Sequence, residues 1–313
     1  MADNGSSIIM AAPLQGITDA AWREAHAEVY GGIDVYFTPF VRIEHGEIRR
    51  RDLREAAPGA DGAAHAVPQI IFRDIDEFDR LTDALAGMGH SRIDLNLGCP
   101  FPPQVRRGRG AGTLARTELL EEVALRTQQL TAVDFSVKMR LGTQQPDGWR
   151  DALAALSAMR LSHVAIHPRT AQQQYGGELH TDAFAEAAEA IPHAIIFNGD
   201  IIDAAGIEAR AAMPGVAGVM LGRGLAARPS LAAEWREGRE WPRSQRIGCL
   251  LEMHRRVFER RSEQLCGDAP VLASMRQFWE YPAAEIGAKA AKAIRKASTM
   301  AKYRAALELI SEK

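Results

Sequence analysis

The sequence predicts an α/β protein, a (β/α)8 TIM barrel over residues 1–240 followed by a small all-helical domain over residues 244–313. Eight short apolar runs alternate with longer amphipathic runs over about 225 residues, which matches the strand count and size of such a barrel. Strand-like runs stop near residue 240, and the remaining chain has only helical patterns. We therefore expect a barrel domain and a separate helical domain.

The strands are predicted from short runs rich in apolar and β-branched residues. These runs lie at residues 7–13, 34–40, 66–72, 92–98, 135–140, 163–169, 194–199 and 216–223. Continuous apolar strands separated by helices indicate a parallel sheet that is covered on both faces. An open doubly wound sheet has the same alternation. We favour the barrel because the count reaches eight and because AAPLQG, not a glycine-rich dinucleotide fingerprint, follows the first strand.

The barrel helices are predicted between these strands, at residues 18–30, 76–88, 117–131, 149–160, 182–190 and 203–211. Several begin with a side chain that can cap a helix, namely Thr18, Asp76, Thr117, Asp182 and Asp203. The stretch 41–64 is longer and more polar than the other connections. It carries Arg49, Arg50, Arg51 and Arg54, and we expect it to form an excursion on the surface.

The composition is that of an ordinary globular protein, with 313 residues, 46% hydrophobic and 25% charged. It excludes disordered, collagen-like and coiled-coil chains. The three cysteines, Cys99, Cys249 and Cys266, lack CxxC spacing, HExxH is absent, and the nine histidines are scattered, so we expect neither disulfides nor a metal. No apolar run approaches ~18 residues and the first residues lack a basic segment before an apolar run, so we expect a cytoplasmic protein without membrane contact. We also expect a monomer.

Charge is unevenly distributed along the chain. Residues 244–313 hold 13 Lys and Arg against 8 Asp and Glu, a net charge of +5, while the preceding residues have a net charge of −7. Lys289, Lys292, Arg295 and Lys296 recur at helical spacing and share one face. That face is either a solvated helix surface or a surface that binds nucleic acid.

Polar side chains and glycines mark the carboxyl ends of the predicted strands, where barrel enzymes hold their active sites. Burying so many polar groups costs free energy unless a ligand pairs with them. The glycines and Arg223 after the last two strands suit a phosphate. Lys138, Gln69 and Asn96 suit a flat polar ring. Taken together, these residues predict a bound flavin mononucleotide (FMN), although each alone could be structural.

Cys99 follows a predicted strand directly and is therefore expected at the same mouth. A thiol can donate a proton at neutral pH, so Cys99 is a candidate general acid, the alternative being a small buried apolar residue. His167 is either a flavin ligand or a second acid. The loop after Cys99 holds Arg106, Arg107 and Arg109, which indicate an anionic substrate or a solvated loop. Its GRGAG run lacks the last glycine of a dinucleotide fingerprint and follows no strand directly, so we do not expect it to bind a dinucleotide.

These motifs together resemble the tRNA-dihydrouridine synthase family. They occur in the family's order over nearly the whole barrel, and DLNLGCP followed by GRGAGTL and then VKMR is the most specific part. The matching segments are APLQGITDAAWR at 12–23, VPQI around Gln69, DLNLGCP at 94–100, VKMR at 137–140, HPRT at 167–170, NGD at 198–200 and LGRG at 221–224. The chain departs from the family in its FPPQV loop, which is one residue longer before Val105, and in Leu14, where Met is usual.

The resemblance implies an enzyme that uses NADPH and FMN to reduce specific uridines in tRNA to 5,6-dihydrouridine. The flavin would deliver hydride to C6, and Cys99 would protonate C5. By position, FMN would be held by Pro13, Leu14, Gln15, Gln69, Lys138, His167, Asn198, Gly199, Asp200, Gly222 and Arg223. The helical domain would bind tRNA. From the residues themselves, we add substrate contacts at Asn96, Arg106, Arg107, Arg109, Arg169, Lys289, Lys292, Arg295 and Lys296.

Two other functions remain open from the sequence. One is a flavin-dependent barrel oxidoreductase that acts on a small pyrimidine or another small molecule, in which the basic helical domain has no role. The other is a tRNA-binding protein without catalysis.

Overall fold

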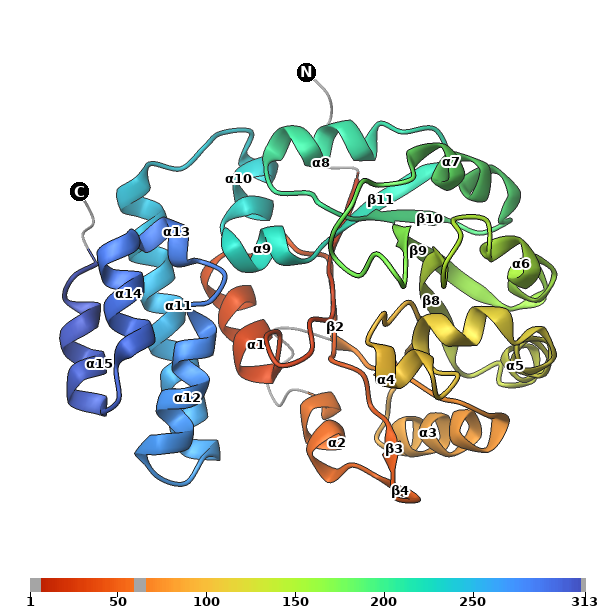
Figure 1. Ribbon diagram of the computed structural model, residues 1–313, viewed down its shortest axis with the longest axis horizontal. Helices are drawn as coiled ribbons and strands as arrows, with labels where there is room; N and C mark the ends of the chain where they lie inside the picture. Colours follow the sequence, from red (N-terminus) through yellow and green to blue (C-terminus); the bar gives the residue numbers. More distant parts are fainter. Residues whose placement is uncertain (1–6, 59–65, 311–313) are drawn as a thin grey trace.

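The computed structural model describes residues 7–58 and 66–310, which form a parallel barrel and an adjoining group of helices (Figure 1). The barrel sheet follows the order β5-β2-β1-β11-β10-β9-β8-β7-β6, and all of its pairs are parallel. Its strands are β1 (Ile8–Ala11), β2 (Val35–Phe37), β5 (Ala66–Val67), β6 (Gln69–Ile70), β7 (Arg92–Leu97), β8 (Asp134–Gly142), β9 (Leu161–Thr170), β10 (Ile195–Asn198) and β11 (Val216–Leu221). The predicted barrel is confirmed.

β5 and β6 are two halves of the one strand that the sequence predicts at 66–72. Pro68 separates them because proline has no N–H to donate to the ladder. β5 pairs with β2 and β6 pairs with β7, so the interrupted strand links both sides of the barrel. Across the break, the Gln69 backbone N–H donates to Thr38 Oγ1 at 3.2 Å. The sheet therefore has eight strand positions, as predicted.

Helices cover the outside of the barrel (Figure 1). The helices of this part of the chain are α1 (Ala20–Val29), α3 (Ile75–Gly87), α5 (Thr117–Gln129), α6 (Trp149–Ala158), α7 (Thr181–Ala190), α8 (Ala204–Ala211), α9 (Arg223–Ala227) and α10 (Leu231–Glu237), of which the short α9 lies at the carboxyl end of β11. Asp203 caps α8 as predicted, accepting from the Gly206 N–H at 2.7 Å. The other predicted caps are wrong by one or two positions. Asp19 and Asp74 cap α1 and α3, whereas Thr117 and Asp182 lie inside the first turns of α5 and α7.

Shorter elements occupy the connections. The described part of the predicted excursion folds into a hairpin, β3 (Ile43–Glu44) and β4 (Glu47–Ile48), and a helix, α2 (Arg50–Ala56). The loop after β7 contains α4 (Pro102–Val105) and a 3-10 helix at Gly110–Ala115. In Figure 1, α2 and the hairpin project from the lower edge of the barrel.

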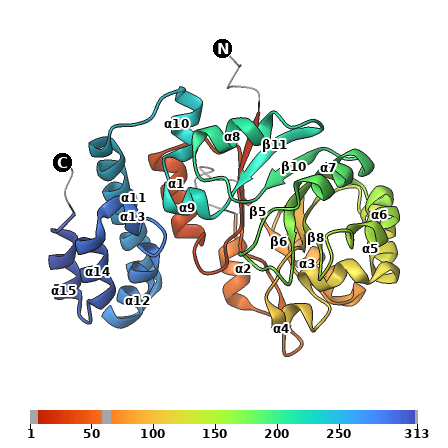
Figure 2. The same cartoon turned by 45° about the horizontal axis from the view of Figure 1, so that its top comes forward.

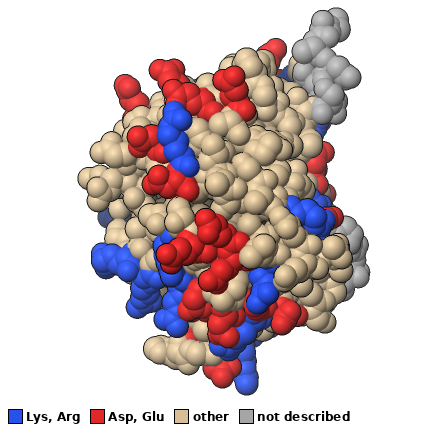
Figure 3. Space-filling model, turned by 90° about the vertical axis from the view of Figure 1, so that its right-hand side faces the viewer, with Lys and Arg blue, Asp and Glu red and all other residues tan. Residues whose placement is uncertain are grey.

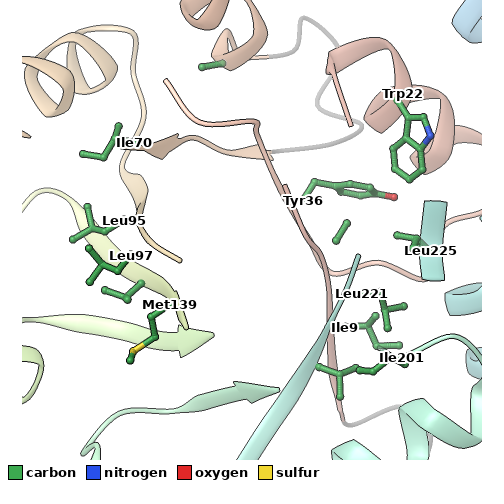
Figure 4. Packing of buried hydrophobic residues seen from close by; sticks show 14 of the residues in the cluster. Ile9, Trp22, Tyr36, Ile70, Leu95, Leu97, Met139, Ile201, Leu221 and Leu225 are labelled. Carbon is green, nitrogen blue, oxygen red and sulfur yellow. The ribbon is translucent and has the colours of Figure 1, made fainter. Parts of the chain in front are cut away.

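Two apolar clusters hold the barrel together. Alternate strand positions fill its interior with Met10, Phe37, Val67, Ala165, Ile196 and Met220. The positions between them pack outward against the helices. Figure 4 shows part of this larger cluster, with Ile9 and Leu221 near Leu225, and Leu95 and Leu97 near Met139.

Within the described residues, only helices follow β11. The helical segment comprises α11 (Arg243–Gln264), α12 (Asp268–Phe278), α13 (Ala283–Ile286), α14 (Ala288–Lys296) and α15 (Met300–Leu307). It lies beside α1, outside the barrel (Figure 2). Arg256 and Arg260 of α11 each pair with Glu28 of α1 at 2.5 Å. No helix in the described ranges is long and apolar enough to span a membrane.

Candidate active site

A cavity of about 930 Å³ lies at the carboxyl ends of the barrel strands. All eleven residues that the sequence predicts as FMN ligands line it, together with Cys99 and Asn96. The strands bring them together because parallel strands in a barrel end at one face. The remaining lining residues are Ala12, Ile17, Phe40, Gly98, Pro100, Arg140, Tyr175, Ile201, Ile202, Met220, Gly224, Ala227, Arg228, Tyr281, Ala284 and Glu285.

A directed chain of hydrogen bonds forms the floor of the cavity. Asp94 is fully buried and accepts from Gln69 Nε2 and from Ser136 Oγ, both at 2.6 Å. Gln69 Oε1 accepts from Asn96 Nδ2 at 2.7 Å. Asn96 Oδ1 accepts from the backbone N–H of Cys99 at 2.8 Å. An ionised carboxylate only accepts, so Asp94 at one end and the backbone N–H at the other end determine how both amides are oriented.

Burial shifts the pKa values of two charged side chains at the cavity, Asp94 and Lys138. Burial raises the pKa of Asp94 to about 6, against the hydrogen bonds from Gln69 and Ser136, which lower it. Burial and the nearby Arg140 charge lower the pKa of Lys138 to about 8. A buried ammonium beside a cavity is suited to an electron-rich or anionic ring edge.

Cys99 is held at the wall of the cavity by the loop that follows it. Its carbonyl accepts from the Ala111 N–H at 3.1 Å. Gly110 has φ +59°, and a Cβ there would lie 2.7 Å from Cys99 Cβ, so only glycine allows this close approach. The GRGAG run therefore packs against Cys99. Burial raises the pKa of the Cys99 thiol, against the lowering effect of Arg140 and Lys138, so the thiol remains protonated at neutral pH.

Glycines and an arginine form the opposite end of the cavity. Gly199 has φ +144°, and a Cβ at this position would lie 2.7 Å from His167 Cδ2. The Asp200 carboxylate pairs with Arg169 and, at 2.8 Å, with Arg223. The hydrogen bond from Arg169 is the main cause that lowers the pKa of Asp200. This carboxylate therefore orients the Arg223 guanidinium at the start of α9.

His167 is neutral at neutral pH. Burial lowers its pKa strongly, and the charges of Arg140 and Lys138 lower it further. A neutral imidazole offers one N–H donor and one acceptor nitrogen to a ligand in the cavity.

The predicted substrate contacts lie in three different environments. Asn96 lines the cavity, whereas Arg106, Arg107 and the four basic residues of α14 are exposed outside it. Arg109, in contrast, is 4% exposed and its guanidinium pairs with Glu77, so the side chain is engaged inside the protein and does not face the cavity. Arg169 is also 4% exposed and its guanidinium is used by Asp200 and the Gly177 carbonyl, so it positions the wall and is not free to bind substrate.

Three residues that line the cavity, Tyr175, Tyr281 and Glu285, were not predicted from the sequence. Tyr175 is 52% exposed, and its ring lies 5.5 Å from the Arg140 guanidinium carbon and 4.8 Å from that of Arg223. Tyr281 and Glu285 reach the cavity from the helical segment. They lie far from any strand end in the sequence. The only local signal was an aromatic residue before the Gly176–Gly177 pair in the loop after β9.

Metal ligands are not grouped in the described chain, where no three His, Cys, Asp or Glu side chains could hold an ion. The donors at the cavity are amides, backbone groups, Lys and Arg, which suit an organic anion.

Comparisons with known proteins identify the family of the chain. The sequence profile described as dihydrouridine synthase (Dus) matches residues 10–306. The chain is 31% identical over 279 residues to a Staphylococcus epidermidis protein named "Probable tRNA-dihydrouridine synthase", covering 86% of this chain and 82% of that protein. It is 30% identical over 251 residues to a Cupriavidus necator protein named tRNA-dihydrouridine(16) synthase, covering 75% of this chain and 78% of that protein.

Among solved structures, a 2-naphthoyl-CoA reductase complex shares the fold alone. It has a TM-score of 0.55 and 10% identity, and the match covers 74% of this chain and 50% of that chain. The family profile, in contrast, spans the barrel and nearly all of the helical segment. From the profile and the sequence relatives, we conclude that the chain belongs to the dihydrouridine synthase family.

Proposed function

We propose that this protein is a tRNA-dihydrouridine synthase that uses FMN and NADPH to reduce specific uridines in tRNA to 5,6-dihydrouridine. The observation that carries the proposal is one cavity that combines a protonated Cys99 thiol, a polar floor and a glycine-lined cationic end. The family of the chain supports the reaction, and the relatives' names support tRNA as the substrate.

The residues present fit FMN. Gln69, Asn96 and Lys138 offer amide groups and an ammonium to a flat ring, while Gly199, Gly222 and Arg223 suit a phosphate. A Cβ at Gly222 would lie 3.7 Å from the Ala12 Cβ, which is an ordinary van der Waals contact, so space alone does not require glycine at this position. The volume of about 930 Å³ is near the top of the range of about 300–1,000 Å³ that is usual for ligand sites. It leaves room for a pyrimidine base beside a flavin.

When bound and reduced by NADPH, FMN would supply the hydride that adds to C6 of uracil. Cys99 supplies the proton that C5 requires, because burial keeps its thiol protonated. The thiolate that remains after transfer lies near Arg140 and Lys138, whose charges stabilise it. The target uridine has to leave its stack to enter the cavity.

The helical domain, residues 244–313, is proposed to hold the tRNA backbone. Lys289, Lys292, Arg295 and Lys296 are exposed on α14 and have no ion pair among the described residues. Cations of this kind attract phosphates. The face of the barrel seen in Figure 3 mixes acidic and basic side chains, which supports a binding surface elsewhere.

The test is to incubate the purified protein with NADPH and unmodified tRNA and to measure dihydrouridine by mass spectrometry, with Cys99→Ala in parallel. We expect product from the wild type, FMN in both proteins, and loss of most product in the variant. If the wild type binds flavin and oxidises NADPH but leaves tRNA unchanged, the tRNA substrate is refuted and small pyrimidines become the substrates to test. If the variant matches the wild type, Cys99 is not the proton donor.

A further inference from the structure

The arginine-rich excursion between β2 and β5 has no part in the site described above. Its described portion, residues 41–58, forms the β3–β4 hairpin and α2. Arg50, Arg51 and Arg54 of α2 are exposed, and within the described residues their side chains make no ion pair or hydrogen bond. Neighbouring arginines behave differently, since Arg42 and Arg49 both pair with Glu44.

A second cavity, of about 240 Å³, lies against this excursion. Gln15 lines both this cavity and the active-site cavity, so the two are neighbours. Arg51 is exposed and also lines the small cavity, which shows that the cavity opens to solvent beside α2.

Two residues that line the small cavity each have a buried polar atom without a hydrogen-bond partner among the described residues, one a donor and one an acceptor. Asp52 is 6% exposed, and its Oδ2 has no hydrogen bond in the described structure. Arg42 Nε is likewise buried without a partner, while the Arg42 Nη2 pairs with Glu44 at 2.7 Å. Burial raises the pKa of Asp52, against the charges of Arg49 and Arg42 and the hydrogen bond from the Arg42 backbone N–H, so Asp52 and Arg42 lie close together. The other carboxylate oxygen of Asp52 pairs with Arg49 at 3.8 Å. Buried polar groups of this kind require a partner.

The other acidic groups of the wall are already engaged. Asp19 caps α1 and pairs with Arg261 at 2.9 Å. Glu55 accepts from the Ala20 N–H at 2.8 Å. The groups left for a ligand are therefore one buried acceptor, one buried donor and the exposed arginines of α2.

We propose that this cavity and α2 form a second RNA subsite, which takes a ribose–phosphate unit of tRNA outside the reduced nucleotide. A ribose 2′-hydroxyl both donates and accepts, so it is the kind of partner that Asp52 Oδ2 and Arg42 Nε lack. The adjoining phosphate meets Arg51, with Arg50 and Arg54 beside it on α2. This inference rests on the proposed function, because tRNA is the partner.

The test measures the affinity of the full-length protein for an unmodified tRNA transcript at several salt concentrations. The double variant Arg51→Gln with Arg54→Gln is compared with Arg92→Gln. This control removes an exposed arginine at the amino end of β7 that has no ion pair within residues 7–58 and 66–310 and lines neither cavity. We expect the double variant to bind tRNA more weakly than the wild type and to reduce the slope of log affinity against log salt by about 1–2. Arg92→Gln should leave tRNA affinity and its salt dependence unchanged, and both proteins should keep the flavin content of the wild type. The proposal is overturned if the double variant binds tRNA with the same affinity and the same salt slope as Arg92→Gln.

Asp52 supplies a second and independent readout. Removing a carboxylate from a surface that faces RNA strengthens binding if only charge matters. If Asp52 accepts from a ribose hydroxyl, Asp52→Ala weakens binding about fivefold, and Asp52→Asn, which keeps an acceptor oxygen, stays within about twofold. Tighter or unchanged binding by a folded Asp52→Ala overturns the subsite. A wild type that binds no tRNA refutes the proposed function itself, which is a separate result.

Discussion

Asp94 is a buried charge whose removal should stabilise the protein. Burial raises its pKa from the ordinary value of 3.8 to about 6. The folded chain therefore binds a proton more readily than the unfolded chain, so folding stability is lost as pH rises between those values. A difference of about two pKa units corresponds to roughly 3 kcal/mol at 1.36 kcal/mol per unit.

Asp94→Asn removes this penalty while keeping the hydrogen bonds. The Asn oxygen accepts from Gln69 Nε2, and the Asn amide donates to Ser136 Oγ, because a hydroxyl can also accept. We expect the flavin-free variant to equal the wild type near pH 4 and to exceed its free energy of unfolding by up to about 3 kcal/mol at pH 8. Urea unfolding followed by tryptophan fluorescence at several pH values measures this difference.

Asp94→Leu is the matched comparison, because it removes the same charge and also the acceptor. The Gln69 amide then loses the partner that orients it, and we expect FMN affinity to fall about tenfold, against less than about threefold for Asp94→Asn. The reasoning is refuted if Asp94→Asn is no more stable than the wild type at pH 8. It is refuted equally if the Leu variant binds FMN as tightly as the Asn variant.

Three further predictions concern the loop after Cys99 and the helical segment. Gly110→Ala should cost about 1–3 kcal/mol of unfolding free energy and lower turnover, because its Cβ would overlap Cys99 at φ +59°; wild-type kinetics would contradict this. Arg109→Met should destabilise the fold by up to about 3 kcal/mol, because the buried Glu77 keeps only the partly exposed Arg73 as an ion-pair partner, without changing the salt slope of tRNA binding in the protein that remains folded. Lys289→Glu with Lys292→Glu should weaken tRNA binding and flatten its salt dependence, and an unchanged slope would mean that this helix face is only solvated.

The barrel was predictable because its pattern is repeated. Eight apolar runs at regular spacing specify a closed parallel sheet, and strand-end residues such as Gln69 and Lys138 then share one face by topology alone. The sequence predicted one strand at 66–72, and the break at Pro68 emerged only from the pairing of β5 with β2 and of β6 with β7.

The contacts of individual arginines were not predictable. Arg106, Arg107 and Arg109 lie within four residues, yet only Arg109 points inward, where Glu77 from α3 is its partner. That partner is 32 positions away, and no local pattern specifies it. Tyr175 was missed for a similar reason, since it reaches the mouth of the cavity only because its loop folds back toward Arg140 and Arg223.

One carboxylate, that of Asp19, joins the two parts of the chain. Its Oδ1 accepts from the Trp22 N–H and begins α1, while its Oδ2 pairs with Arg261 of α11. α1 in turn follows the loop that carries Pro13, Leu14 and Gln15 to the cavity. A protein shortened to the barrel would lose the contacts of α11 with α1, including the Arg261–Asp19 ion pair. The loop before α1 would then lose the helix packing that holds it in place. Deleting the helical segment would therefore compromise flavin retention as well as RNA affinity, and point substitutions on α14 are the way to separate the two.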